Sequence, residues 1–189
     1  MSTNLSDTVK ISQALPENAS ALSKLLAKTW LATYPNEEFD ISIEDINRRV
    51  YGTSGERLEQ SIHKWERIIS EIGPNKLILT AKTGHAIIGM VGANIDDNEL
   101  SRGNITALYV LPEAQGNGVG TKLMTAALAW LGKTEDICVV VASYNQKAIG
   151  FYKRFGFQET GNQIEDLSAR RTGDKEIPEI EMILKRSRD

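Results

Sequence analysis

Residues 113–124, EAQGNGVGTKLM, place three glycines within five positions, directly between two apolar patterns. The preceding run ITALYVL, residues 105–111, is typical of a strand that Pro112 ends, and an apolar stripe at helical spacing follows from Val119 to Trp130. A strand that leads through a glycine-rich turn into a helix N-terminus forms an anion site, because free backbone N–H groups and the helix dipole converge there. We therefore expect a phosphate ligand to approach this turn, rather than glycines that serve close packing alone.

Two common phosphate motifs do not match this turn. A P-loop requires Lys and then Ser or Thr directly after its last glycine, whereas here Thr121 precedes Lys122. A dinucleotide fingerprint lies near the first strand and is followed by an acidic residue at a strand end. Here the turn lies past the middle of the chain, and Glu135 comes before the next strand instead of ending one. The residues alone thus indicate an anionic ligand close to the backbone.

Elsewhere the chain alternates between strand and helix patterns without repeats or linkers. We predict strands at 8–15, 76–82, 86–95, 105–111, 137–143, 158–167 and 177–184, and helices at 16–34, within 43–72, from the glycine turn to Leu131, and at 145–157. In the last helix Asn145 is the expected N-cap and Gly156 the expected C-cap. This order predicts one α/β domain.

Composition narrows the function classes. The 189 residues are 41% hydrophobic and 25% charged with a net charge of -3, which is typical of a globular protein and argues against a nucleic-acid binder. Cys138 is the only cysteine, and His63 and His85 are the only histidines, so we expect neither a disulfide nor a metal site. There is no apolar run long enough for a membrane span and no signal-peptide core, so a cytoplasmic location is expected.

The stretch LYVLPEAQGNGVGTKLM resembles the acetyl-CoA-binding segment of the GNAT family of N-acetyltransferases. The family's pattern is Gln or Arg, two residues, Gly, one residue, and Gly or Ala, which reads here from Gln115 to Gly120. NQKAIGFYKRFGF, residues 145–157, resembles a later helix of the same family. The resemblance covers most of the chain, most firmly from Ile105 to Phe157 and loosely over the first 75 residues.

The resemblance implies an α/β (α+β) fold with a single GNAT-like domain over residues 1–189. Its central sheet would be mixed and mostly antiparallel, with about seven strands flanked by helices, and would splay between strands four and five. Residues 7–75 would supply the N-terminal strand and the acceptor-side helices. Residues 76–189 would form the sheet and the acetyl-CoA-binding core.

The same resemblance implies an acetyl-CoA-dependent N-acetyltransferase and its site residues. The pyrophosphate of coenzyme A would lie on the turn amides and its pantetheine arm along strand four, with these cofactor-binding residues: Leu108, Val110, Gln115, Gly116, Asn117, Gly118, Val119, Gly120, Thr121 and Asn145. Tyr152 would face the thioester sulfur as general acid, with core packing as its rival role, and Trp30 and Tyr34 would line the acceptor pocket. The acceptor would be a polyamine, another small amine or a protein amine that attacks the thioester directly.

Several points stay open at this stage. ITALYVL lacks the glutamate that some relatives carry as general base, which leaves Tyr109, Ser143 or Glu44. The main alternative to an enzyme is a non-catalytic acyl-CoA-binding module, and a third is a binder of another phosphate ligand. Arg170 and Arg171 either recruit an acidic substrate or lie in a solvated loop, which is the simpler interpretation. Whether the chain forms a homodimer is also open.

Overall fold

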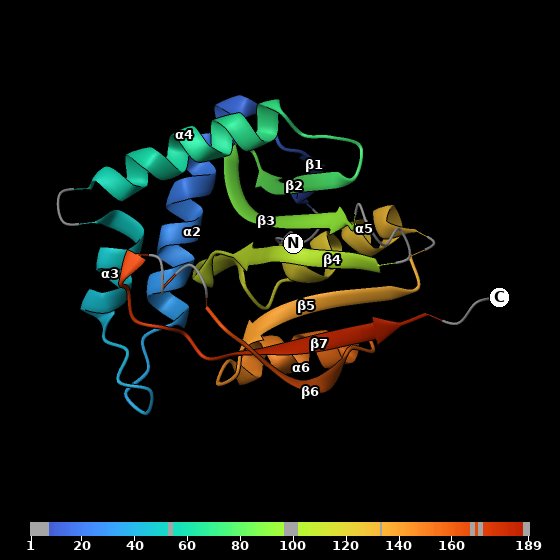
Figure 1. The fold of residues 1–189 in the computed structure, drawn as a ribbon. Helices are drawn as coiled ribbons and strands as arrows, with labels where there is room; N and C mark the ends of the chain where they lie inside the picture. The colour runs from blue at the N-terminus through green and yellow to red at the C-terminus, as the bar shows by residue number, and fades with distance from the viewer. Residues whose placement is uncertain are drawn as a thin grey trace, which may run out of the picture.

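The fold is built on one seven-stranded sheet (Figure 1), seen here in a computed structural model that describes residues 8–52, 55–96, 102–132, 134–166, 169 and 172–186. The strands are β1 (Lys10–Gln13), β2 (Lys76–Thr83), β3 (Ala86–Ile95), β4 (Arg102–Val110), β5 (Asp136–Ala142), β6 (Gln158–Ile164) and β7 (Glu179–Lys185). Each coincides with an apolar or alternating run that the sequence marks as a strand. Arg170 and Arg171, for which a role in recruiting an acidic substrate was considered, lie outside the described residues.

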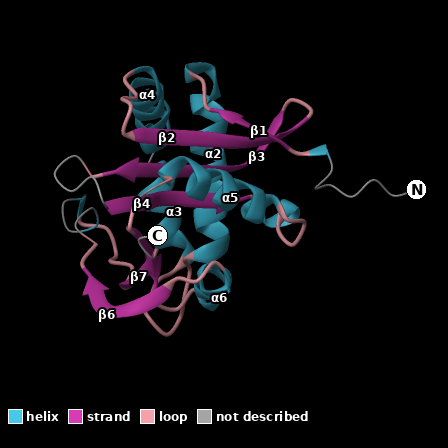
Figure 2. Cartoon of the chain, turned by 90° about the vertical axis from the view of Figure 1, so that its right-hand side faces the viewer, coloured by secondary structure: helices cyan, strands magenta, loops and turns pink. Residues whose placement is uncertain are grey.

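The sheet order is β1-β2-β3-β4-β5-β7-β6, and Figure 2 shows the strands stacked from β1 at the top to β6 at the bottom. All neighbouring strands are antiparallel except β4 and β5, which are parallel. A parallel pair needs a crossover connection, and this one contains a helix. The predicted mixed, mostly antiparallel sheet is confirmed.

Helices cover both faces of the sheet. One face carries α2 (Ala19–Thr33), α3 (Ile43–Tyr51) and α4 (Glu56–Ser70), and the other carries α5 (Val119–Leu131) and α6 (Gln146–Arg154) (Figure 1). Two short 3₁₀ turns, Pro16–Asn18 and Pro112–Ala114, precede α2 and the glycine turn. No helix in the described part of the chain combines the length and the apolar character that a membrane crossing needs.

A β-bulge divides β4 into two halves. Ala93 of β3 pairs with Ile105, and Gly92, the residue before Ala93, pairs with Ala107. Thr106 is therefore an extra residue in β4. A side chain at Gly92 would bring its Cβ within 2.7 Å of the Thr106 hydroxyl oxygen, which is why a glycine lies opposite the bulge. Before the bulge Ile105 faces the α5 core, and after it Leu108 does.

The bulge also decides where Tyr109 points. Because it shifts the alternation by one residue, Tyr109 packs with the α2 and α4 side of the sheet instead of the α5 side. Beyond the bulge, β4 and β5 separate. Their ladder runs from Arg102 opposite Asp136 to Ile105 opposite Val139 and ends there, although both strands continue. The predicted splay between strands four and five is therefore present.

Candidate functional site

The separation of β4 from β5 leaves a stretch of β4 paired on one side only. The amide of Leu111 donates to the carbonyl of Ile88 on β3 at 2.9 Å, so by alternation the backbone groups of Leu108 and Val110 point away from β3, into the gap. The carbonyl of Val110 already accepts a hydrogen bond from Gln115 Nε2 at 2.9 Å. The two residues predicted to bind the pantetheine arm thus lie on the open edge of the strand.

The floor of this gap is exposed on the α2 side. Val140 sits in the middle of β5, a central strand of the sheet, yet 43% of it is accessible to solvent. A large apolar side chain in such a position is normally covered. Its exposure shows that the sheet is open to solvent at this point of β5, on the face that α2 and α3 flank.

The glycine turn follows directly from the end of β4. Gly116 and Gly118 have φ values of 80° and 76°, a region that other residues rarely adopt. Gly118 is the N-cap of α5 and supplies no side-chain cap, and the first turn of the helix holds no acidic residue. The first intrahelical bond runs from Lys122 N to Gly118 O at 3.0 Å, so the amides from Val119 to Thr121 have no helical acceptor. The arrangement fits a bound phosphate.

The polar side chains of the turn point into it. Asn117 Nδ2 donates to the carbonyl of Gln115 at 3.1 Å, and Lys147 of α6 donates to Gln115 Oε1. These bonds fix the turn and tie it to α6. The amide of Gln115 donates to the Pro112 carbonyl at 3.3 Å, so in this part of the turn a phosphate contact is expected from the backbone amide of Asn117.

Helix α6 presents its N-cap and Tyr152 to the same region. Asn145 Oδ1 accepts from the amide of Ala148 at 3.1 Å, which confirms the predicted cap and leaves the Nδ2 group unpaired among the described residues. Tyr152 is only 6% exposed and packs against Phe151 and Phe157. Its hydroxyl forms no hydrogen bond within the described part of the chain. Burial, with a smaller effect of Tyr109, holds its pKa far above the usual value, so the hydroxyl stays protonated.

Aromatic side chains pack on the α2 side of the sheet, next to the end of the β4–β5 ladder. Trp30 of α2 and Tyr34, the C-cap of that helix, pack edge to face with centroids 4.9 Å apart, and the Tyr144 hydroxyl donates to the Tyr34 carbonyl at 2.8 Å. Burial raises the pKa of Tyr34 and of Tyr109, whose hydroxyls also act on each other. The Trp30 indole N–H faces Tyr109 closely enough to lower its pKa, but it makes no hydrogen bond of ordinary geometry within the described residues.

Glu179, which the sequence patterns did not single out, also faces this side. It is the first residue of β7 and lies opposite Ala142, the last residue of β5. Burial, with the nearby Asp166 carboxylate, raises its pKa to about 6, although the Arg49 guanidinium acts in the opposite direction. The alternation in PEIEMIL, residues 178–184, places Glu179 on one face of a strand. This pattern is the sequence feature that could have pointed to Glu179.

The three residues considered as the base lie in different places. Glu44 is exposed on α3, Ser143 lines a hollow with Phe39 and Tyr144, and Tyr109 is partly buried with a raised pKa. Of the three, only Tyr109 lies close to Trp30 and Tyr34. None of the three is a carboxylate that faces the gap.

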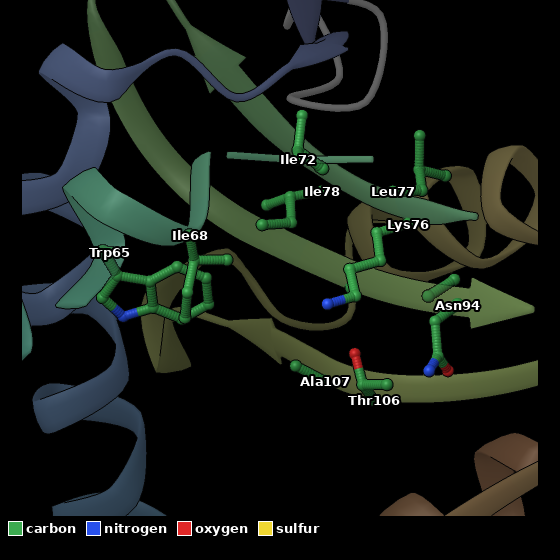
Figure 3. Close-up of a pocket in the computed structure, with 11 residues that line it drawn as sticks. Trp65, Ile68, Ile72, Lys76, Leu77, Ile78, Asn94, Thr106 and Ala107 are labelled. Atoms are coloured by element: carbon green, nitrogen blue, oxygen red, sulfur yellow. The ribbon is translucent and has the colours of Figure 1, made fainter. Parts of the chain in front are cut away.

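A second, apolar hollow lies on the α2 and α4 face (Figure 3). Trp65, Ile68 and Ile72 of α4 form one wall, and β2, β3 and β4 form the floor. Trp65 packs against the core cluster between α2, α4 and the sheet and is only partly buried there. The lining contains no carboxylate, tyrosine, histidine or cysteine, so this hollow lacks groups for proton transfer near neutral pH.

Comparison with known proteins agrees with this geometry. A model of the acetyltransferase (GNAT) family matches residues 23–157. The peptidyl-lysine N-acetyltransferase YjaB of Escherichia coli strain K12 is 36% identical over 69 residues, which is 36% of this chain and 45% of that protein. The matched part thus spans less than half of the relative's length.

Solved structures share the fold over nearly the whole chain. The PaiA N-acetyltransferase of Thermoplasma acidophilum, in complex with coenzyme A, superposes with a TM-score of 0.67 at 22% identity and covers 94% of this chain and 99% of its own. The yncA protein of Salmonella typhimurium, with acetyl-CoA, gives a TM-score of 0.66 at 14% identity and covers 96% and 95%. At such low sequence identities, the TM-scores show a common fold and nothing finer. With the family match over well more than half of its length, the chain belongs to the acetyltransferase (GNAT) family.

Proposed function

We propose that this protein transfers the acetyl group of acetyl-CoA to a primary amine, by direct attack of the amine on the thioester. The observation that carries the proposal is the end of the β4–β5 ladder at Ile105 and Val139, next to an uncapped helix N-terminus. An open strand edge can pair with an extended, amide-containing chain such as pantetheine. The amides at the start of α5 suit the pyrophosphate that follows it.

The cofactor would be held mainly by backbone groups. Leu108 and Val110 offer groups on the open edge, and the amides from Gly116 to Thr121 surround the turn. The free Nδ2 group of Asn145 adds one side-chain donor at the start of α6. Similar folds solved with coenzyme A and acetyl-CoA support this assignment.

Tyr152 would donate a hydrogen bond to the thioester sulfur. Its buried hydroxyl is protonated at any working pH, so a donor is always present. The thiol of coenzyme A resembles that of cysteine, which has a pKa of about 8.5. Its thiolate is therefore a weaker base than the phenolate that Tyr152 would form. Tyr152 therefore stabilises the departing sulfur by a strong hydrogen bond, and the thiolate takes a proton released by the amine nitrogen in the course of the reaction.

The acceptor would approach from the α2 side. Trp30, Tyr34 and Tyr109 line that approach, and aromatic rings suit both an alkyl stem and a cationic head. The partial similarity to a peptidyl-lysine N-acetyltransferase favours a lysine-like amine among the acceptors that the sequence leaves open.

The test is an acetyl-transfer assay that follows free thiol release. The panel would contain a lysine-containing peptide, spermidine, a peptide with a free α-amine, and buffer alone. We expect amine-dependent thiol release and an acetylated product detected by mass spectrometry. Binding of acetyl-CoA without turnover of any amine would instead indicate the non-catalytic acyl-CoA-binding module. A larger rise in melting temperature with NAD or ATP than with acetyl-CoA would reject the cofactor assignment.

A further inference from the structure

The carboxylate of Glu179 lies at the acceptor end of the gap. Glu179 and Val140 share a sheet face, because Glu179 is opposite Ala142, two residues beyond Val140 in β5. Ala142 packs into the cluster that α2 and α3 form, so this is the face the aromatic residues line. Tyr152 lies on α6, on the opposite side of the sheet.

Tyrosines lie between the two ends of the gap. Glu179 acts electrostatically on Tyr34 and Tyr109, and Tyr152 acts on Tyr34 as well. Tyr109 in turn acts on Tyr152, but Glu179 has no such effect on it. Glu179 and Tyr152 are thus both close to the Tyr34 and Tyr109 pair, and they belong to opposite faces of the sheet. Direct attack needs a proton acceptor on the amine side and a donor on the sulfur side.

Glu179 has no hydrogen-bond or ion-pair partner in the part of the chain that the structure describes. Within the described residues its carboxylate accepts no hydrogen bond and forms no ion pair, although it is more than half buried. Glu181, two positions further on the same strand, pairs with Arg102 at 2.8 Å and accepts from Asn162. A half-buried carboxylate without a partner is costly, which suggests that its partner is a ligand.

Every element packed around Glu179 contributes a charged or titratable neighbour. These are Tyr34 of α2, Arg49 of α3, Tyr109 of β4, Tyr144 after β5, and Asp166 after β6. Arg49 pairs with Asp166 at 2.7 Å and stacks over the Trp30 ring, so its guanidinium is directed to those groups. Arg49 is thus engaged by Asp166 and Trp30, and an acceptor ammonium that enters the gap would supply a cation for the Glu179 carboxylate.

We propose that Glu179 binds the acceptor ammonium and takes its proton, as the general base of this reaction. This assignment rests on the proposed acetyltransferase function. The ammonium gives one proton to the Glu179 carboxylate, and the nitrogen lone pair forms a bond to the thioester carbonyl carbon. The C–S bond then breaks and the electron pair goes to sulfur. A second proton from nitrogen balances the thiolate as free thiol, and Glu179 returns its proton to water.

The experiment is a pH profile of kcat/KM for Glu179→Gln with two acceptors. In the natural protein, activity should fall as pH drops below about 6, where Glu179 is protonated and no longer accepts a proton. In the variant this limb should vanish, and the rate toward an alkylamine should rise about tenfold per pH unit toward its pKa of ~10. At pH 7 we expect a loss of roughly 10²-fold or more. A peptide α-amine, with a pKa of ~8, should lose less because more of it is already neutral.

Glu181→Gln is the matched control, since it changes the same charge on the same strand face. It should keep both the rate and the limb near pH 6, and Glu179→Asp, which retains a carboxylate, should restore part of the rate. All three variants should keep the rise in melting temperature with acetyl-CoA, which shows that the fold and the cofactor site are intact. An active natural protein whose Glu179→Gln variant keeps its rate and its limb overturns the assignment alone. No turnover by the natural protein would overturn the proposed function first.

Discussion

Tyr152 owes its suitability as a donor to burial rather than to a charged neighbour. The ring packs between Phe151 and Phe157, and the hydroxyl is the only polar group it carries. Without a cation to stabilise the phenolate, the raised pKa keeps the hydrogen on the oxygen. The packing role and the donor role belong to different atoms of one side chain, so they can be tested separately.

Tyr152→Phe removes the oxygen and keeps the ring. We expect kcat to fall by roughly 10²-fold, because the departing sulfur loses its hydrogen bond, while the melting temperature and the affinity for acetyl-CoA change little. The measurement is single-turnover thiol release, so that chemistry and not product release is observed. A near-normal single-turnover rate would assign Tyr152 to packing only.

At the scale of elements, the strand, turn and helix around the glycines could be predicted from the sequence because all their determinants are local. The end of β4 at Pro112, the positive φ of Gly116 and Gly118, and the cap at Asn145 depend on residues within a few positions of one another. The splay of β4 from β5 was expected only from resemblance to a family. Strand pairing is non-local, and no short pattern encodes where a ladder ends.

Glu179 could not be found for the same reason. Its place in the site depends on the pairing of β7 with β5, two strands that lie about 40 residues apart in the chain. Within the sequence Glu179 and Glu181 look alike, as alternate carboxylates on one strand. Only the fold distinguishes the one that pairs with Arg102 from the one that faces the gap.

The N-terminus of α5 can be tested as an element. Gly118→Val places a β-branched residue at a φ of 76°, which costs about 1–2 kcal/mol, and adds bulk beside the turn amides. In the natural protein, acetyl-CoA at 100 times its Kd should stabilise the fold by about 2.7 kcal/mol. We expect the variant to lose most of this gain, measured as the shift in melting temperature.

Gly73→Ala serves as the control for that substitution. Gly73 precedes β2, has no positive φ, and a Cβ there would meet no atom within 4 Å. This variant should keep the full shift with acetyl-CoA. If Gly118→Val also folds and keeps it, the glycine turn is a packing device and not a phosphate site.

At the scale of the whole molecule, one buried ion pair joins the early helices to the end of the chain. Arg49 of α3 and Asp166 lie 2.7 Å apart with side chains 9% and 7% exposed. Asp166 also accepts from the backbone amides of Ala169 and Ile177. The acceptor side of the gap therefore depends on contacts between segments that are more than 100 residues apart.

Asp166→Ala should destabilise the protein by about 3–5 kcal/mol, since it leaves Arg49 buried beside an empty position. This corresponds to a fall in melting temperature of roughly 6–20 °C. Because Asp166 raises and Arg49 lowers the pKa of Glu179, the acidic limb of the activity profile should move to lower pH. Glu159→Ala, which breaks the exposed pair with Lys153, should cost less than about 1 kcal/mol and leave the limb in place. An unchanged melting temperature for Asp166→Ala would show that the pair contributes little.

The bulge at Thr106 reverses, within a single strand, which residues face each side of the sheet. If the same residues continued from Ile105 in simple alternation, without the bulge, Tyr109 would turn toward α5 and Leu108 toward the acceptor side. The backbone groups on the open edge would then belong to Tyr109 and Leu111 instead of Leu108 and Val110. One extra residue thus couples two choices, namely which side chain lines the acceptor side and which amides meet the cofactor. Point substitutions can tune either choice, but loss of the bulge with the same residues in the strand would alter both at once.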